Sequence, residues 1–194
     1  LEGFPLSYLR NKPRKIYKHF KLASTLDETS PVQSSISRSD GLYELCVVTP
    51  DRRRLFARIA GMLSYFDMNI VKGYGFANRQ DIVLDFFEFF DSNSRFRHTH
   101  EIKRFRRMLH SVLTDTLSIR ELLRQKTSSP LLMKMGTLEP VVYFEDDRER
   151  DVTLMEIISP DKPGLLYSIG SVLSAAECDI QLLLINTEGE KAVD

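Results

Sequence analysis

The chain has 194 residues, of which 42% are hydrophobic and 28% charged, proportions that suit a globular protein with its own hydrophobic core. Its 27 Lys and Arg residues balance its 27 Asp and Glu residues, which argues against a nucleic-acid binder or a membrane-surface protein. No stretch approaches the length of about 18 apolar residues that a membrane span needs, and no signal peptide opens the chain. We therefore expect a cytoplasmic protein that, lacking an initial Met, is a piece of a longer one.

Residues 1–40 predict a helical segment followed by a linker. Pro13 suits the first turn of a basic helix that ends near Thr25. The residues expected on its inner side are Ile16, Phe20 and Leu22 or Ala23. The Ser-rich stretch from Asp27 to Gly41 predicts a linker without regular structure.

Residues 41–147 predict a first α+β domain. Alternation and helical periodicity mark its elements in chain order: a strand at 42–50, a helix at 51–66, strands at 69–78 and 82–90 around a turn at 78–81, a helix at 98–126, and a strand at 140–146. This βαββαβ order is the pattern of ferredoxin-like sandwiches.

A second copy of the same pattern begins near residue 148. The phrase "TPDRRRLFARI" at 49–59 returns as "SPDKPGLLYSI" at 159–169. The repeat offset, defined as the separation of Asp51 and Asp161, also pairs Asn69 with Asp179 and Ile70 with Ile180. Matches across strand, turn and helix indicate a tandem repeat. Residues 148–194 form the second domain, which stops at "KAVD" and so lacks one helix and one strand of the pattern.

A strand followed by "PDKPGLL", an amphipathic helix and "DI" resembles the ACT domain, a small ligand-binding regulatory module. Both copies, with "FPLSYLRNKPRKIYKHFKLAS" before them, resemble the C-terminal region of the family of bifunctional uridylyltransferase/uridylyl-removing enzymes that modify the PII nitrogen-signalling protein. The fold that the resemblance implies is α+β: two ferredoxin-like ACT modules, the second truncated, preceded by a helical segment.

In that family the ACT pair senses glutamine, and other domains carry out the chemistry. The resemblance therefore implies a regulatory, amino-acid-sensing region that acts on fused catalytic domains or on the PII protein. We find no nucleotidyltransferase or metal-hydrolase signature and expect no cofactor or metal. A stand-alone ACT-repeat protein that regulates or dimerises is the alternative. We also expect a homodimer or close pairing of the two modules, because each sheet leaves an edge to be covered.

The second phrase predicts a ligand site. The start of a helix attracts a carboxylate, Gly164 admits a close approach, and Asp161 can attract an ammonium group. We expect the start of the following strand to lie beside the same loop. The predicted ligand-binding residues are Asp161, Lys162, Pro163, Gly164, Leu165, Asp179, Ile180 and Gln181. The alternative is that this phrase is only a strand-to-helix turn.

The first phrase predicts a second site that is altered by three arginines. Arg54 stands where the second copy has Gly164, so its side chain either fills the pocket or grips a carboxylate; we favour the filled pocket. The residues of this possible site are Asp51, Arg52, Arg53, Arg54, Asn69 and Ile70.

Three further features have simple interpretations. His98 and His100 are spaced for a metal, but they lie at a loop-to-helix junction that favours a solvated surface. The basic run at 103–110 suggests RNA binding, although its apolar residues fit a buried helix stripe with charges in solvent. Cys46 and Cys178 lack metal spacing, and we expect two buried, reduced thiols, with a disulfide between the two copies as the alternative.

Overall fold

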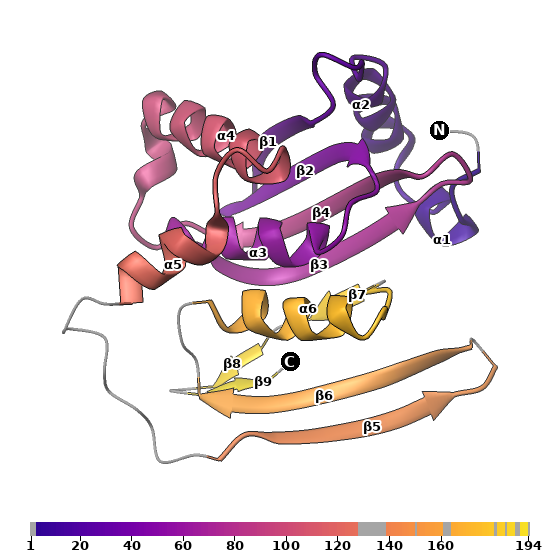
Figure 1. Cartoon of the computed structure of the whole chain (residues 1–194). Helices are drawn as coiled ribbons and strands as arrows, with labels where there is room; N and C mark the ends of the chain where they lie inside the picture. Colours follow the sequence, from indigo (N-terminus) through magenta and orange to yellow (C-terminus); the bar gives the residue numbers. More distant parts are fainter. Residues whose placement is uncertain are drawn as a thin grey trace.

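The computed structural model describes residues 3–127, 139–149, 151–160, 164–180, 182–184, 186–188 and 191–193. Figure 1 shows two stacked sheets with helices on and between them. The helices are α1 (Leu6–Leu9), α2 (Pro13–Ala23), α3 (Leu55–Tyr65), α4 (Thr99–Leu113), α5 (Ile119–Thr127) and α6 (Leu165–Ala175), with a 3-10 turn η1 (Arg95–Arg97). The strands are β1 (Gln33–Ser39), β2 (Leu42–Pro50), β3 (Asn69–Ala77), β4 (Ile82–Phe90), β5 (Val141–Asp147), β6 (Val152–Pro160), β7 (Leu182–Leu184), β8 (Asn186–Glu188) and β9 (Lys191–Val193).

The first sheet has the strand order β1-β2-β4-β3-β7 with antiparallel pairing throughout. Helices α3, α4 and α5 cover one face, where the main hydrophobic core contains Leu45, Phe87 and Phe105. The α+β class expected from the sequence is therefore observed. The order β1-β2-β4-β3 is the order of a ferredoxin-like sheet, in which β1 occupies the place of that fold's fourth strand.

The prediction of an unstructured linker at 27–41 was wrong, because β1 pairs with β2 over its full length. Ser-rich composition hid a strand whose outer edge and one face are exposed to solvent. The overlooked signal is the Asp40-Gly41 pair, whose residues have φ of 52° and 87°. Two such residues between strands form the preferred tight hairpin turn.

Helices α1 and α2 cover the opposite face of the first sheet (Figure 1). A second buried cluster joins Phe4 and Tyr8 to Cys46, Val48 and Phe86 of the sheet. The helix opening at Pro13 is confirmed, and Ile16 packs against this cluster.

Phe20, expected on the inner side of α2, is 50% exposed, and its neighbour His19 is buried instead. His19 fits because its ring lies 4.4 Å from that of Phe86, and its Nδ1 makes a 3.1 Å hydrogen bond with the Tyr8 hydroxyl.

The second sheet has the order β5-β6-β9-β8. The strand predicted at 140–146 is present as β5, but it does not complete the first sheet. It pairs with β6 from Val141↔Ile158 to Asp147↔Val152. Pairing with the next strand along the chain requires only a short turn, and β1 already fills the vacant edge of the first sheet.

The helix predicted at 98–126 is interrupted between α4 and α5. Asp115 has φ of 60°, which ends the helical geometry. Arg52 donates a hydrogen bond to the Leu113 carbonyl and Arg58 donates one to the Val112 carbonyl, so two cations satisfy the last carbonyls of α4.

The boundaries of the elements follow the repeat. Both ends of β6 are separated from the ends of β2 by the repeat offset, and the same holds for α6 and α3. Asp67 and Glu177, which the offset also pairs, both have φ of 60°. The strand before the loop and the helix after it therefore have equivalent bounds in the two copies, despite their different residues.

Both cysteines are free thiols, but only Cys46 is buried; Cys178 is exposed, contrary to expectation. Burial is the main cause of the raised pKa of the Cys46 thiol. Among the described residues, none of the helices is both long and apolar enough to cross a membrane.

Candidate functional site

The two copies of the repeat pair with each other through equivalent strands. Strand β7 extends the first sheet beside β3, with Lys72 opposite Leu184, Gly73 opposite Leu183 and Tyr74 opposite Leu182. The repeat offset makes Leu183 the equivalent of Gly73, so the pairing is symmetric about these two residues. A local two-fold axis therefore relates the copies.

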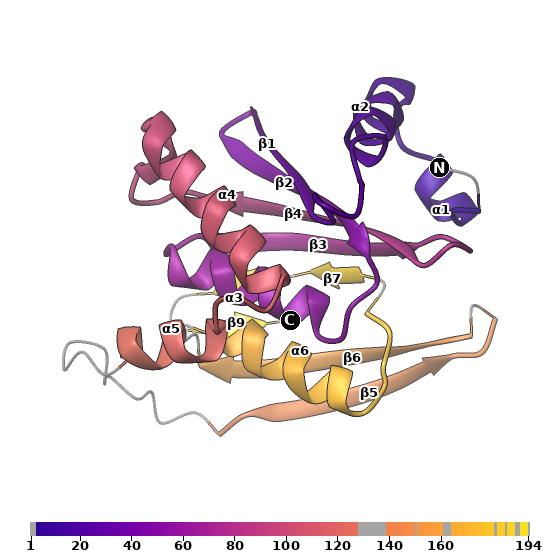
Figure 2. The same cartoon turned by 45° about the horizontal axis from the view of Figure 1, so that its top comes forward.

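The helices α3 and α6 obey the same symmetry. The Arg54 N–H donates a hydrogen bond to Ser174 Oγ at 3.1 Å, and the Gly164 N–H donates one to Ser64 Oγ at 2.7 Å. Each serine lies near the end of one helix and accepts the hydrogen bond from the start of the other. Figure 2 shows α3 and α6 next to each other. Unpaired N–H groups at a helix start need such partners.

Arg54 and Gly164 share a left-handed backbone. Arg54 has φ of 61° and ψ of 24°, and Gly164 has φ of 81° and ψ of 8°. Glycine adopts this region freely, whereas other residues are strained there. Gly164 is thus explained first by backbone geometry, since a Cβ there would meet Leu123 at an ordinary distance of 3.5 Å.

The three arginines of the first phrase have different roles. Arg52 is partly buried and binds the end of α4. Arg53 is exposed, with its guanidinium 4.0 Å from the Glu177 carboxylate of the other copy. Arg54 is exposed and precedes α3. Arg52 is therefore a structural residue, while Arg53 and Arg54 remain accessible at the start of α3.

The sequence had suggested that Asn69 and Ile70 lie beside Asp51–Arg54, but the structure separates them. They follow the far end of α3, whose 11 residues span about 16 Å. Asn69 pairs with Phe90, at the end of β4 away from Ile82, whereas Ile82 pairs with Pro50 next to Asp51. A helix that runs antiparallel to its flanking strands necessarily separates these positions.

The strand start of the other copy takes that place instead. The chain at Asp179 and Ile180 crosses over Gly75, where an added Cβ would lie 2.8 Å from the Ile180 carbonyl oxygen and 3.2 Å from Asp85 Oδ1. Only glycine allows this approach. The loop of the first copy and the strand start of the second copy thus meet around Asp85.

Asp85 is a buried carboxyl group with an exposed fraction of 3%. Burial, together with the nearby charges of Asp51 and Asp179, raises its pKa to about 8. In the sequence, Asp85 is a polar residue within the apolar stretch 82–90. Asp85 becomes part of a site only through the second copy, whose Asp179 and Ile180 lie beside it.

Thr49 lies on the same face of the sheet as Asp85. It is opposite Val83 on β4, and Val47 is opposite Asp85, so the two side chains are diagonal neighbours. Thr49 is fully buried, and its Oγ1 has no hydrogen-bond partner among the described residues. A buried hydroxyl without a partner is unfavourable unless a ligand or water completes it.

We call Thr49, Asp51, Asp85, Asp179 and the Ile180 carbonyl the Asp85 site. This site lies at the start of α3. Phe56, in the first turn of α3, covers Gly73 and Phe87, which are the next residue pair along the sheet. Carboxyl groups and a carbonyl suit an ammonium group, and a helix start with arginines suits a carboxylate. The site can therefore hold a zwitterion.

The local symmetry defines an equivalent position at Gly164 and Leu165, beside the strand start at Asn69 and Ile70. Gly164 is buried there, and Leu123 of α5 lies next to it. The predicted ligand residues Asp161, Lys162, Pro163 and Gln181 lie outside the described residues.

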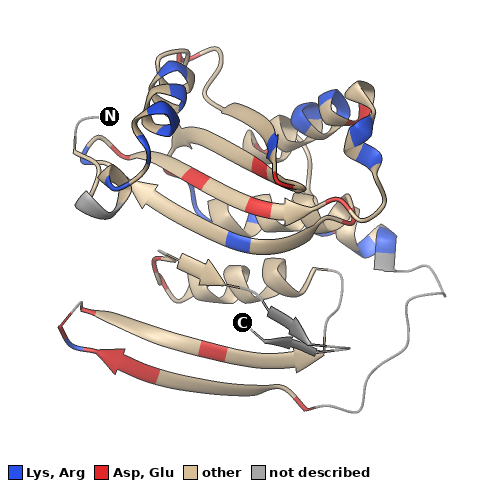
Figure 3. Ribbon diagram, turned by 180° about the vertical axis from the view of Figure 1, so that it is seen from behind, with Lys and Arg blue, Asp and Glu red and all other residues tan. Residues whose placement is uncertain are grey.

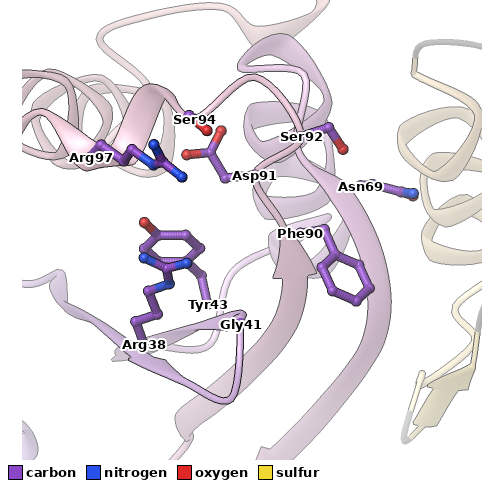
Figure 4. A pocket seen from close by; sticks show the side chains of 9 residues that line it. All are labelled: Arg38, Gly41, Tyr43, Asn69, Phe90, Asp91, Ser92, Ser94 and Arg97. Carbon is purple, nitrogen blue, oxygen red and sulfur yellow. The ribbon is translucent and has the colours of Figure 1, made fainter.

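A separate hollow lies at the opposite end of the first sheet. It has a volume of about 260 Å³ and is lined by Arg38, Gly41, Tyr43, Asn69, Phe90, Asp91, Ser92, Ser94 and Arg97 (Figure 4). Asp91 is already used, because its carboxylate accepts the N–H groups of Arg95 and Phe96. Arg38 stacks over the Tyr43 ring. Tyr43 is the one buried residue of this lining, and the others are partly or fully exposed.

His98 and His100 stack with their ring centres 5.5 Å apart. Within the described part of the chain no three His, Cys, Asp or Glu residues are grouped to hold a metal ion. In the basic run, Phe105 and Leu109 are buried while Lys103 and Arg107 are exposed, as a buried stripe with solvated charges requires.

The fold and the paired copies define a tandem α+β protein with ferredoxin-like strand order. The chain is a homologue, over nearly its whole length, of bifunctional uridylyltransferase/uridylyl-removing enzymes. It is 26% identical to that of Azospirillum brasilense over 198 residues, 99% of this chain and 21% of the relative. It is 28% identical to the enzyme of Nitrosospira multiformis over 197 residues, which are 99% of this chain and 22% of the relative.

The relative from Caulobacter vibrioides is 25% identical, with 92% of this chain and 19% of the relative covered. The chain thus spans about a fifth of the length of the curated relatives it matches. No protein-family model and no solved structure matches it.

Proposed function

We propose that this chain is the amino-acid-sensing region of a cytoplasmic protein-PII uridylyltransferase-like enzyme, a tandem ACT region whose effector is glutamine. The whole enzyme would carry its catalytic domains elsewhere, since the relatives named above are about five times longer than the region they share with this chain. Effector binding would change how the two copies pack and so bias the attached domains.

The observation that carries this proposal is the Asp85 site between the copies. The ligand's ammonium group would face Asp85, Asp179 and the Ile180 carbonyl, and its carboxylate would face the start of α3. Thr49 would supply the hydroxyl that contacts the ligand. The chain elements that form the site belong to different copies, so a ligand there contacts both and favours their packed state.

The proposal recombines the residues that the sequence had assigned. The loop Asp51–Arg54 works with Asp179–Gln181, and the loop Asp161–Leu165 works with Asn69 and Ile70. Arg53 and Arg54 then attract the carboxylate of the effector, in place of the filled pocket that the sequence favoured. The loop with Gly164 forms the second, symmetry-related binding place.

Thermal unfolding with and without ligand tests the proposal. A ligand that binds only the folded chain stabilises it by about 2.7 kcal/mol at about 100 times its Kd. We expect glutamine to raise the Tm of the chain, and glutamate and alanine at the same concentration to raise it less. No change with any amino acid at about 10 mM, a generous excess over effector affinities, would refute amino-acid sensing and favour the stand-alone structural alternative.

A further inference from the structure

Two exposed patches of opposite charge lie on this neutral chain. The helix patch is the outer side of α2 and consists of Arg14, Tyr17, Lys18, Phe20 and Lys21. Tyr17 is 58% exposed and Phe20 is 50% exposed, and Lys21 lies over the Tyr17 ring. The segment 3–26 contains six Lys or Arg residues and no Asp or Glu. The patch thus combines aromatic surface with positive charge.

The hairpin patch is one face of β5 and β6 and consists of Tyr143, Glu145, Leu154 and Glu156. Tyr143 is opposite Glu156 and Glu145 is opposite Leu154, so all four side chains share one face. All are exposed, with Leu154 at 62%. Five acidic residues and two arginines occupy 145–151. Figure 3 shows the acidic residues of β5 in red and the basic residues of α2 in blue.

The first copy shows how such patches fit together. Cys46 and Val48 of β2 face α2, and Lys15 of α2 forms an ion pair with Glu44 of β2 at 2.5 Å. Their equivalents in the second copy, Leu154, Glu156 and Ile158, form the corresponding face of β6. No described helix covers that face, which keeps large apolar side chains and carboxylates in solvent.

We propose that the hairpin patch is the docking surface for the helix patch of a second copy of this chain. In this contact α2 of one protomer lies on the hairpin patch of the other, as α2 lies on β2 within the first copy. Aromatic and aliphatic side chains meet at the centre, and Lys and Glu side chains flank them.

Charge-reversed pairs test this dimer. Sedimentation velocity of the chain at about 100 µM and about 50 mM salt should show a dimer that weakens as salt rises. Lys18→Glu with Lys21→Glu, or Glu145→Lys with Glu156→Lys, should each weaken the dimer at least about tenfold, because the contact then joins like charges. A 1:1 mixture of the two double variants should recover the dimer, since each contact then joins opposite charges.

Matched controls separate this contact from general charge attraction. Lys103→Glu with Arg107→Glu makes the same charge change on the exposed side of α4 and should leave the dimer intact. Phe20→Ser, at an exposed position, should weaken it at any salt concentration. Three results would overturn the proposal. These are a monomeric parent chain at about 100 µM and about 50 mM salt, a mixture of the two double variants that stays monomeric, or an α4 variant whose dimer is weakened as much as theirs.

Discussion

Gly164 and Ser64 are joined by a 2.7 Å hydrogen bond from the backbone N–H of one copy to the hydroxyl of the other. Its symmetry mate joins Arg54 to Ser174. These two bonds explain why the phrase occurs twice: each copy supplies the partner that the start of the other copy's helix requires.

Removing both serines should loosen the pair of copies. Ser64→Ala and Ser174→Ala each leave a helix-start N–H without a partner, which costs about 1 kcal/mol or somewhat more. Denaturant unfolding measures the loss. Ser171→Ala is the control on the same helix, because Ser171 Oγ is buried without a hydrogen-bond partner in the described part of the chain; it should be neutral or stabilising. An equal loss in all three would contradict this account.

The left-handed positions should respond in opposite directions. Arg54→Gly relieves backbone strain and should raise the free energy of unfolding by about 0.5–1 kcal/mol. Gly164→Ala should lower it by about 1 kcal/mol through the backbone alone, since its Cβ would meet Leu123 at an ordinary distance. Equilibrium unfolding of both variants measures this, and changes of the same sign would show that φ does not govern these positions.

His19 should make the chain sensitive to acid. Burial, together with the charges of Lys15 and Lys18, lowers the pKa of His19 to about 4; the value in the unfolded chain is about 6.5. The unfolded state therefore takes up a proton first, and stability is lost as the pH falls from about 6.5 to 4, by up to about 1.4 kcal/mol per unit. His19→Gln should remove this dependence; an unchanged pH profile in that variant would count against it.

Asp85 should have the opposite dependence. Its folded pKa of about 8 lies above the unfolded value of 3.8, so the folded state holds the proton more tightly. The free energy of unfolding should fall as the pH rises from about 4 to about 8. Asp85→Asn should flatten that slope. If the Asp85→Asn variant kept the same fall of the free energy of unfolding with pH, Asp85 would not be the buried, protonated group that causes it.

The repeat and most element positions could be predicted from the sequence, because the apolar runs at 42–50 and 82–90 are strands of a sheet with a buried cluster on each face. The partner of β5 could not be predicted, since any apolar strand of that length fits either sheet edge. Strand β1 was missed because Ser37 and its neighbours are polar at an exposed edge.

The candidate site was only half predictable. The loops and strand starts were identified as Asp51–Arg54 and Asp179–Gln181, but their combination across the copies depends on the pairing of β3 with β7. Thr49 gave no signal in the sequence, since a Thr at the end of a strand is ordinary. Its importance arises from burial without a partner among the described residues.

Titration calorimetry of glutamine into the chain and its Thr49→Val variant tests the central claim most directly. Valine keeps the shape but removes the hydroxyl, so the variant should be as stable as the parent or more stable. We predict that it binds glutamine about tenfold more weakly, the loss of one hydrogen bond of about 1.4 kcal/mol. Equal affinity in the parent, Thr49→Val and Asp85→Asn would contradict an effector site between the copies.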